Sequence, residues 1–206
     1  MKKLLSLILT LALLLSIPCS AYATITERKS KEAERFLWDE LSVYSPTDQI
    51  TAAVLAYFWR ESQYRSDAVA GWGNSLHGYG IDLCEKVTER TDKGLEDGSS
   101  RDYFLKACRK YGGYGLGQWQ SPSKVEALYD FAVGYGGSIG DAELQCAFVF
   151  DNLENGYPRL WKRLKKCKSA EKAGRLLAIY YDGTKEGMYY IGYKAKQFYE
   201  KYGGDA

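Results

Sequence analysis

The chain has 206 residues, of which 46% are hydrophobic and 26% are charged, with 28 Lys and Arg against 26 Asp and Glu. This length and apolar content exclude a disordered chain and fit one globular domain with its own core. The near balance of charge argues against a dedicated nucleic-acid-binding protein, in which a strongly basic composition is expected. Tyrosine is unusually frequent, with 18 residues against 7 phenylalanines.

The first 23 residues have the pattern of a secretory signal peptide. Lysines at positions 2 and 3 precede an apolar stretch at 4–17 and an Ala-x-Ala cleavage motif at 21–23. The apolar stretch is shorter than the roughly 20 residues that a membrane-spanning helix needs, which disfavours a retained anchor. We therefore expect residues 24–206 to form the mature protein, secreted outside the cell or bound to the cell wall. Cleavage would remove two lysines and no acid, so the remaining charges balance.

Four cysteines remain in the mature chain. An exported domain with this number is expected to form two disulfides, with three possible pairings. The simplest is between sequence neighbours, Cys84 with Cys108 and Cys146 with Cys167. No pair has C-x-x-C spacing and the only histidine, His77, is not placed as a ligand, so no metal or other cofactor is expected. Any Ser-His or Cys-His mechanism would depend on His77, which disfavours those enzyme classes.

The mature chain has mainly helical periodicity, without an internal repeat or a domain linker, and predicts a mainly α fold. Ser45-Pro46-Thr47-Asp48 is typical of a helix start, with Ser45 as the cap and Pro46 in the first turn. Two glycine-rich stretches, 71–100 and 111–120, break the pattern, and the first has room for one short helix around Cys84. The predicted helices cover about residues 30–41, 46–61, 122–135, 141–155, 169–183 and 188–202.

A glutamate stands at the end of the second predicted helix, after three aromatic residues. Glu61 follows the run Tyr57-Phe58-Trp59. Desolvation by these rings and the partial negative charge of a helix C-terminus both predict a raised pKa. A carboxyl group that stays protonated near neutral pH suits a general acid. The alternative is an ordinary surface glutamate, paired with Arg60 or Arg65.

The glycine-rich stretch 111–120 adds a second feature. Its sequence, Tyr-Gly-Gly-Tyr-Gly-Leu-Gly-Gln-Trp-Gln, places Tyr114, Gln118 and Trp119 among four glycines. Glycine lets the backbone approach a ligand closely and adopt positive φ. Aromatic faces and an amide beside such a backbone suit a sugar. A phosphate-binding loop is disfavoured because no Lys-Ser/Thr follows the glycines.

Taken in order, two motifs resemble the signature of the lysozyme superfamily, which includes goose-type lysozymes and lytic transglycosylases. They are Arg60-Glu61-Ser62-x-Tyr64 and Tyr114-Gly-Leu-Gly-Gln118-Trp119. Within that superfamily the chain resembles the phage tail lysozyme family, in which an apolar helix leads into Glu-Ser-x-Phe/Tyr and Tyr-Gly-x-x-Gln-Trp follows. The resemblance covers about residues 46–203.

The resemblance implies a lysozyme-like helical domain with a glycine-rich cleft loop. It also implies cleavage of the β-1,4 bond after N-acetylmuramic acid in peptidoglycan by a monomeric enzyme, with Glu61 as the catalytic acid. The substrate-binding residues expected around it are Ser62, Tyr64, Tyr114, Gln118, Trp119 and Tyr181. Two departures stand out: Arg65-Ser66 replaces the usual Asn-Pro, and residues 71–113 look longer than usual. We interpret the longer segment as a disulfide-stapled insertion at the edge of the cleft.

The sequence leaves two alternatives for the group that attacks the sugar carbon after the bond is protonated. An inverting hydrolase needs a second carboxylate about 6.5–9.5 Å from the acid, and Asp67, Asp82 and Glu85 are candidates by position alone. Without one, the 6-hydroxyl of muramic acid would attack and leave a 1,6-anhydro product, as in a lytic transglycosylase. A hypothesis from another class is a catalytically silent wall-binding module. The basic run 162–168 is either a solvated helix end or a surface that attracts anionic wall polymers.

Overall fold

The computed structural model describes residues 31–69 and 81–204, and within these ranges it is mainly helical, as predicted. The predicted signal peptide and His77 lie outside the described residues. No helix within these ranges has the length and apolarity to span a membrane. The elements in chain order are α2 (Lys31–Tyr44), α3 (Asp48–Ser62), α4 (Ile81–Asp92), α5 (Arg101–Tyr111), α6 (Pro122–Tyr135), α7 (Ala142–Asp151), the π-helix η1 (Asn152–Gly156), α8 (Pro158–Leu164), α9 (Ala170–Leu177), the π-helix η2 (Ala178–Asp182) and α10 (Met188–Tyr202).

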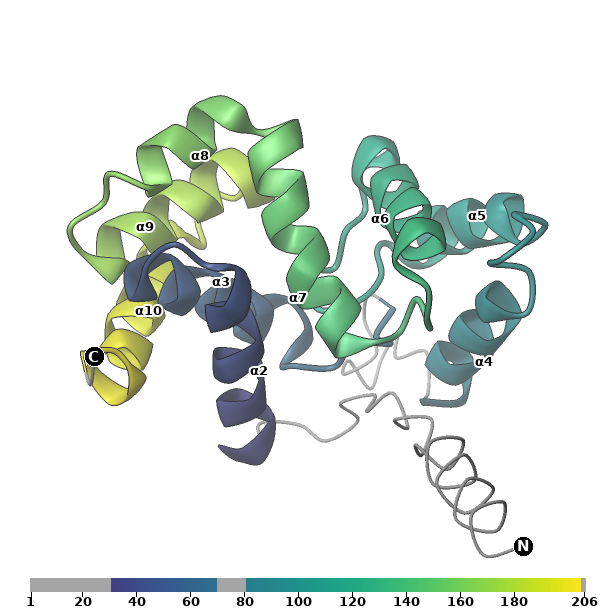
Figure 1. The fold of residues 1–206 in the computed structure, drawn as a ribbon, viewed down its shortest axis with the longest axis horizontal. Coiled ribbons are helices and arrows are strands. Elements are labelled where there is room, and N and C mark those ends of the chain that lie inside the picture. The colour runs from purple at the N-terminus through teal and green to yellow at the C-terminus, as the bar shows by residue number, and fades with distance from the viewer. Residues whose placement is uncertain (1–30, 70–80, 205–206) are drawn as a thin grey trace, which may run out of the picture.

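The helices form two groups, with α7 between them (Figure 1). In the larger group α3, α9 and α10 all contact one another, and α2 packs against α3. In the smaller group α5 contacts both α4 and α6. Because α7 contacts α2 on one side and α6 on the other, it joins the two groups into one hydrophobic core.

Helix α3 is the central helix of the larger group. Every side chain from Ile50 to Phe58 is buried, so the helix is covered on all sides rather than along one stripe. Its N-cap is Thr47, whose side chain accepts a hydrogen bond from the backbone of Ile50. The prediction of Ser45 as the cap is therefore wrong by two residues. Ser45 instead donates to the backbone oxygen of Thr47 at 2.8 Å, in the turn before the helix.

Three helices differ from the sequence prediction. Helix α4 is longer than the short helix expected around Cys84, and α5 and α8 were not predicted. Helix α5 shows why: eleven residues bury only Phe104, Ala107 and Cys108, and charged residues occupy much of the rest. Its apolar residues share one face, but the segment is short and lies between the two glycine-rich stretches, and tertiary packing supplies most of such a helix's stability.

The four described cysteines form no disulfide. Cys84, Cys108, Cys146 and Cys167 are all free and buried. The sulfur of Cys84 accepts from the backbone of Val69 at 3.5 Å, and the other thiols likewise lie within the core. The predicted pairings are therefore wrong, and α4 and α5 are not stapled to each other. These thiols pack as small apolar side chains, which is common for buried cysteine.

Candidate functional site

Glu61 lies in the last turn of α3 and its side chain is 18% exposed. The helix ends one residue later, where Gln63 and Tyr64 both adopt left-handed backbone conformations with φ of 54° and 73°. A buried ion pair stabilises the following turn: Arg65 Nε lies 2.6 Å from Asp67 Oδ1 and its Nη2 2.8 Å from Oδ2. Residues 65 and 66, which replace the usual Asn-Pro, thus belong to a rigid turn fixed by a bidentate ion pair.

A second carboxylate meets Glu61 at one guanidinium group. Arg60 Nη1 donates to Glu61 Oε1 and also to Asp182 Oδ2, the latter at 3.0 Å. Two oxygens that bond to the same nitrogen lie within about 6 Å of each other. Asp182 is the last residue of η2, is 13% exposed and precedes Gly183, which has a left-handed backbone. The ends of α3 and η2 therefore place two acids side by side.

The pKa of Glu61 is raised to about 7. Desolvation by burial is the largest cause, and the negative charge of Asp182 is the next. Arg60 and Lys124 oppose the rise because their positive charges favour the carboxylate. The predicted upward shift is confirmed, with the charge of Asp182 added to the predicted desolvation. Burial also raises the pKa of Asp182, against the same two cations.

Lys124 brings a cation to this site from the other group of helices. It lies in the first turn of α6, and its Nζ donates to the backbone oxygen of Tyr181. Nζ is 4.0 Å from the ring centroid of Tyr181 and 5.3 Å from that of Tyr157. Burial lowers the pKa of Lys124 to about 8, although Asp182 and Glu61 both favour its charged form. The site thus contains two acids and two cations held by three elements.

A layer of buried rings supports η2. Trp119 Nε1 donates to the hydroxyl of Tyr181 at 3.0 Å, and that hydroxyl donates to Asn152 Oδ1 at 3.0 Å. The ring of Tyr181 also packs edge-on against Tyr57, with centroids 5.7 Å apart. Trp119 and Tyr181 are both nearly inaccessible to solvent. They hold the backbone that carries Asp182, which is a positioning role rather than direct contact with a ligand.

The glycines of the glycine-rich loop allow close packing against other groups of the protein, whereas the sequence suggested close approach to a ligand. Gly115 has φ of +78°, and a Cβ there would lie 2.5 Å from Gln145 Oε1. A Cβ at Gly117 would lie 2.6 Å from the ring of Trp119. Gln118 Nε2 donates to the backbone oxygens of Ala68 and Gly115, both at 2.9 Å. The Oε1 atom of Gln118 is buried and has no hydrogen-bond partner among the described residues.

Three of the predicted substrate-binding side chains lie in the core. Ser62 is buried and donates to the backbone oxygen of Phe58 at 3.1 Å. Tyr64 is fully buried and its hydroxyl donates to Glu34 at 3.2 Å, so it fastens α2 to the turn after α3. Tyr114 is fully buried as well. These side chains are inaccessible to a substrate in this structure, because their apolar area is used in the core.

None of the sequence candidates for the second carboxylate is among the charges that shift the pKa of Glu61. Asp67 is 1% exposed and paired with Arg65, and Asp82 and Glu85 are exposed on α4. Asp182, Lys124 and the role of Arg60 as a shared donor were not predicted from the sequence. The one available signal was that Tyr181, implied by the resemblance, is followed by an acid and a glycine. Within residues 31–69 and 81–204 no group of His, Cys, Asp and Glu is arranged to hold a metal ion.

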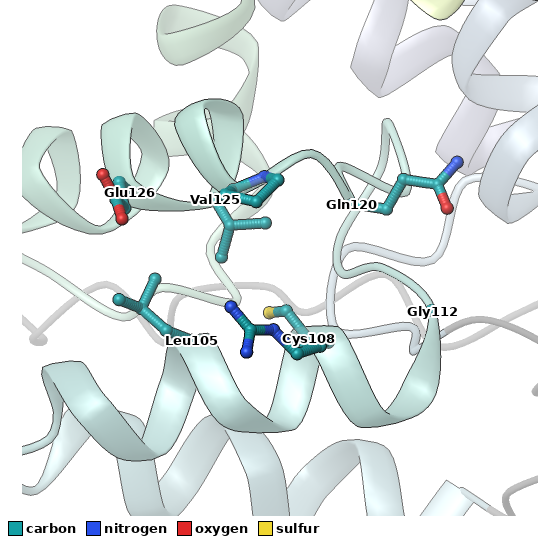
Figure 2. Close-up of a pocket in the computed structure, with 8 residues that line it drawn as sticks. Leu105, Cys108, Gly112, Gln120, Val125 and Glu126 are labelled. Atoms are coloured by element: carbon teal, nitrogen blue, oxygen red, sulfur yellow. The ribbon is translucent and has the colours of Figure 1, made fainter.

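A cavity of about 220 Å³ opens between α5 and α6. Figure 2 shows Leu105 and Cys108 of α5 facing Val125 of α6 across it. Neither Glu61 nor Asp182 is among its lining residues. This cavity therefore belongs to the smaller group of helices and not to the site of the two acids.

The mainly helical fold, and a buried acid of raised pKa beside a second carboxylate, are consistent with a lysozyme-like protein. The sequence matches the family described as phage tail lysozyme over residues 32–202, and the chain belongs to that family. The match includes α2, which lay outside the resemblance predicted for residues 46–203. Comparison with curated proteins and with solved structures gave no match. The family implies a lysozyme-like activity on peptidoglycan, by hydrolysis or by transglycosylation.

Proposed function

We propose that the protein cleaves the β-1,4 bond between N-acetylmuramic acid and N-acetylglucosamine in peptidoglycan, with Glu61 as the general acid. The observation that carries the proposal is the pKa of Glu61, about 7, beside a second carboxylate. Family membership supports the substrate class. A carboxyl group with this pKa is available in both protonation states near neutral pH, as general acid catalysis requires.

In this mechanism protonated Glu61 gives its proton to the glycosidic oxygen as the bond to the sugar carbon breaks. Positive charge develops on the sugar ring, and the carboxylate of Asp182 stabilises it until water adds to the same carbon and gives its proton to the ionised Glu61. Carboxyl groups are about 5–5.5 Å apart in retaining enzymes and 6.5–9.5 Å apart in inverting ones. Because Glu61 and Asp182 share one donor nitrogen of Arg60, the shorter spacing fits better. We therefore assign the second carboxylate to Asp182.

The supporting residues around the two acids are buried. Gln118 fixes the glycine-rich loop through the bonds of its Nε2 to the backbone oxygens of Ala68 and Gly115, and its Oε1, which is also buried, has no hydrogen-bond partner among the described residues. Ser62, Trp119 and Tyr181 are buried beneath the two acids and fix the ends of α3 and η2. Their contribution to catalysis is therefore positional.

Clearing of a suspension of purified cell walls tests the assignment of Glu61. Glu61→Gln keeps the shape of the side chain but removes the proton, and should lower the clearing rate by about 10²- to 10⁴-fold. Glu186→Gln, a change at an exposed acid just after η2, should leave the rate unchanged. Equal clearing by wild type and Glu61→Gln would contradict the assignment. Binding to walls without clearing by the wild type would favour a silent wall-binding module.

A lytic transglycosylase is the second candidate. The guanidinium of Arg60 stands between the two acids, where an inverting hydrolase would place its water. This favours attack by a hydroxyl of the substrate itself. Mass spectra of the released fragments separate the two reactions, because hydrolysis leaves reducing ends and transglycosylation leaves 1,6-anhydro ends.

Export by residues 1–23 is part of the same proposal, because peptidoglycan lies outside the cytoplasmic membrane. The pattern of two lysines, an apolar stretch and an Ala-x-Ala motif supports it. The mass of the protein recovered from the culture medium or the wall fraction should correspond to a chain that starts at Thr24. A cell-associated chain that starts at Met1 would contradict export.

A further inference from the structure

A cavity of about 380 Å³ lies where η1 and α8 meet η2. Its volume falls within the about 300–1,000 Å³ of typical ligand pockets. We name it the Tyr157–Tyr180 cavity; its lining residues are Gly156, Tyr157, Pro158, Arg159, Leu160 and Tyr180. Two aromatic rings, a proline ring and a leucine give it mainly apolar walls, and an exposed guanidinium group stands at its edge.

One lining residue of the cavity, Tyr157, contacts residues of the site of the two acids. Tyr157 packs edge-on against Tyr181, with ring centroids 5.0 Å apart, and Lys124 approaches both rings. Tyr180 precedes Tyr181 in η2, but its side chain is 50% exposed whereas that of Tyr181 is buried. One short π-helix therefore supplies an exposed ring to the cavity, a buried ring beneath the site and, at Asp182, one of the acids.

Positive charge surrounds the exposed ring. The guanidinium carbon of Arg163 lies 4.4 Å from the ring centroid of Tyr180. In the part of the chain that the structure describes, no carboxylate lies within ion-pair distance of Arg159 or Arg163. These two residues belong to or adjoin the basic run 162–168, and their charge is available to an anionic ligand. Guanidinium groups suit carboxylates because they donate two parallel hydrogen bonds.

We propose that the Tyr157–Tyr180 cavity is a subsite for the peptidoglycan strand next to the bond that is cleaved. One sugar packs its apolar face on Tyr157 and Tyr180, and Arg159 and Arg163 bind a carboxylate of the stem peptide attached to that strand. The cavity's apolar walls, two cations without an ion pair among the described residues, and the contact of Tyr157 with Tyr181 and Lys124 all match this ligand. The inference rests on the proposed function, since it assumes that Glu61 and Asp182 act on peptidoglycan.

The test measures binding without cleavage, in the full chain carrying Glu61→Gln. Soluble peptidoglycan fragments are titrated in two forms, one with stem peptides and one from which an amidase has removed them. Tyr180→Ala should weaken binding of both forms by about tenfold, because it removes the stacking ring. Arg163→Gln should weaken binding of the peptide-bearing form by about two- to fivefold and leave the peptide-free form unchanged.

Tyr189→Ala is the matched control. Tyr189 is also exposed and also lies beneath a guanidinium group, that of Arg175 at 5.0 Å, but it stands on α10 away from the cavity lining. It should bind both fragments as tightly as the parent. Unchanged binding after Tyr180→Ala, or no binding by the parent, would overturn the subsite. An equal loss of both forms after Arg163→Gln would overturn the carboxylate contact. Failure of the proposed function shows separately, as cell-wall clearing that does not depend on Glu61.

Discussion

The carboxylates of Glu61 and Asp182 share one donor nitrogen, and the charge of Asp182 raises the pKa of Glu61. The acid at the end of α3 is therefore tuned by a residue that η2 brings from far along the chain. Burial alone would raise the pKa as well, but Asp182 adds a further rise that depends on a specific partner, and Arg60 and Lys124 oppose it. The relationship predicts how the pH dependence of activity responds to substitution.

Asp182→Asn should shift the alkaline limb of the pH profile of kcat/KM, where activity falls as the pH rises, to lower pH. Glu61 must be protonated to act, so the rate falls as the pH rises through its pKa of about 7. Removing the negative charge of Asp182 makes ionisation of Glu61 easier and lowers that pKa. We expect a shift of roughly one pH unit in the profile of kcat/KM, together with a lower maximum because the stabilising carboxylate is lost.

The control for this change is Glu186→Gln, which removes an exposed acid just beyond η2 and should leave the profile in place. A limb that stays fixed in Asp182→Asn would show that Asp182 does not interact with the catalytic acid. A limb that moves to higher pH would assign the titrating group to a residue other than Glu61.

Lys124→Met should move the same limb in the opposite direction. The charge of Lys124 lowers the pKa of Glu61, so its removal lets that pKa rise and extends activity to higher pH. Methionine retains much of the buried length of the side chain. Lys106→Met, at an exposed lysine of α5, should not move the limb. Shifts of the same sign in Lys124→Met and Asp182→Asn would contradict the electrostatic explanation.

Local sequence singled out Glu61 and gave Arg60 as an alternative ion-pair partner, but it did not point to Asp182 or Lys124. Glu61 could be chosen because aromatic neighbours on one helix predict desolvation without knowledge of tertiary structure. Asp182 could not, because its position depends on the π-helical turn of η2 and on rings from other elements. The same limit explains Tyr64 and Tyr114: the resemblance assigns both to motif positions, but whether a ring faces solvent or core depends on packing.

The helical fold was predictable where most residues of a segment are apolar, as in α3 and α7. Helix α5 was not predicted, although it is amphipathic, because it is short and lies between the two glycine-rich stretches. The disulfides were predicted from the number of cysteines and from export alone. The number of cysteines carries no information about their distances. The structure places the thiols of the four described cysteines in the core, each without a partner sulfur.

The state of the cysteines can be measured directly. Four free thiols per chain starting at Thr24 should react with a thiol reagent after unfolding, because Cys84, Cys108, Cys146 and Cys167 are unpaired. Little reaction is expected in the native state, since all four are buried and burial raises the pKa of each. Addition of a reducing agent should leave the Tm unchanged. Fewer than four reactive thiols in the unfolded chain would show that the protein does contain a disulfide.

Gln145 is the residue whose loss should disturb the glycine-rich loop most. Its Oε1 accepts from the backbone of Leu116 at 2.7 Å, and its Nε2 donates to the backbone oxygens of Ser66 and Ile139 at 2.7 and 2.8 Å. One buried amide thus joins the turn after α3, the glycine-rich loop and the segment before α7. It stands as the polar side chain of an otherwise apolar helix, Leu144 to Phe150.

Gln145→Leu should lower the free energy of unfolding by about 3 kcal/mol or more, because three buried backbone groups lose their partner and each unsatisfied group costs about 1–3 kcal/mol. Urea unfolding of the variant and of wild type gives the difference. Gln197→Leu, at a surface amide bonded only to Tyr193, should change the value by about 0.5 kcal/mol or less. A loss equal to that of Gln197→Leu would show that the three backbone groups are satisfied in another way. If the loop positions Gln118, cell-wall clearing by folded Gln145→Leu should also fall.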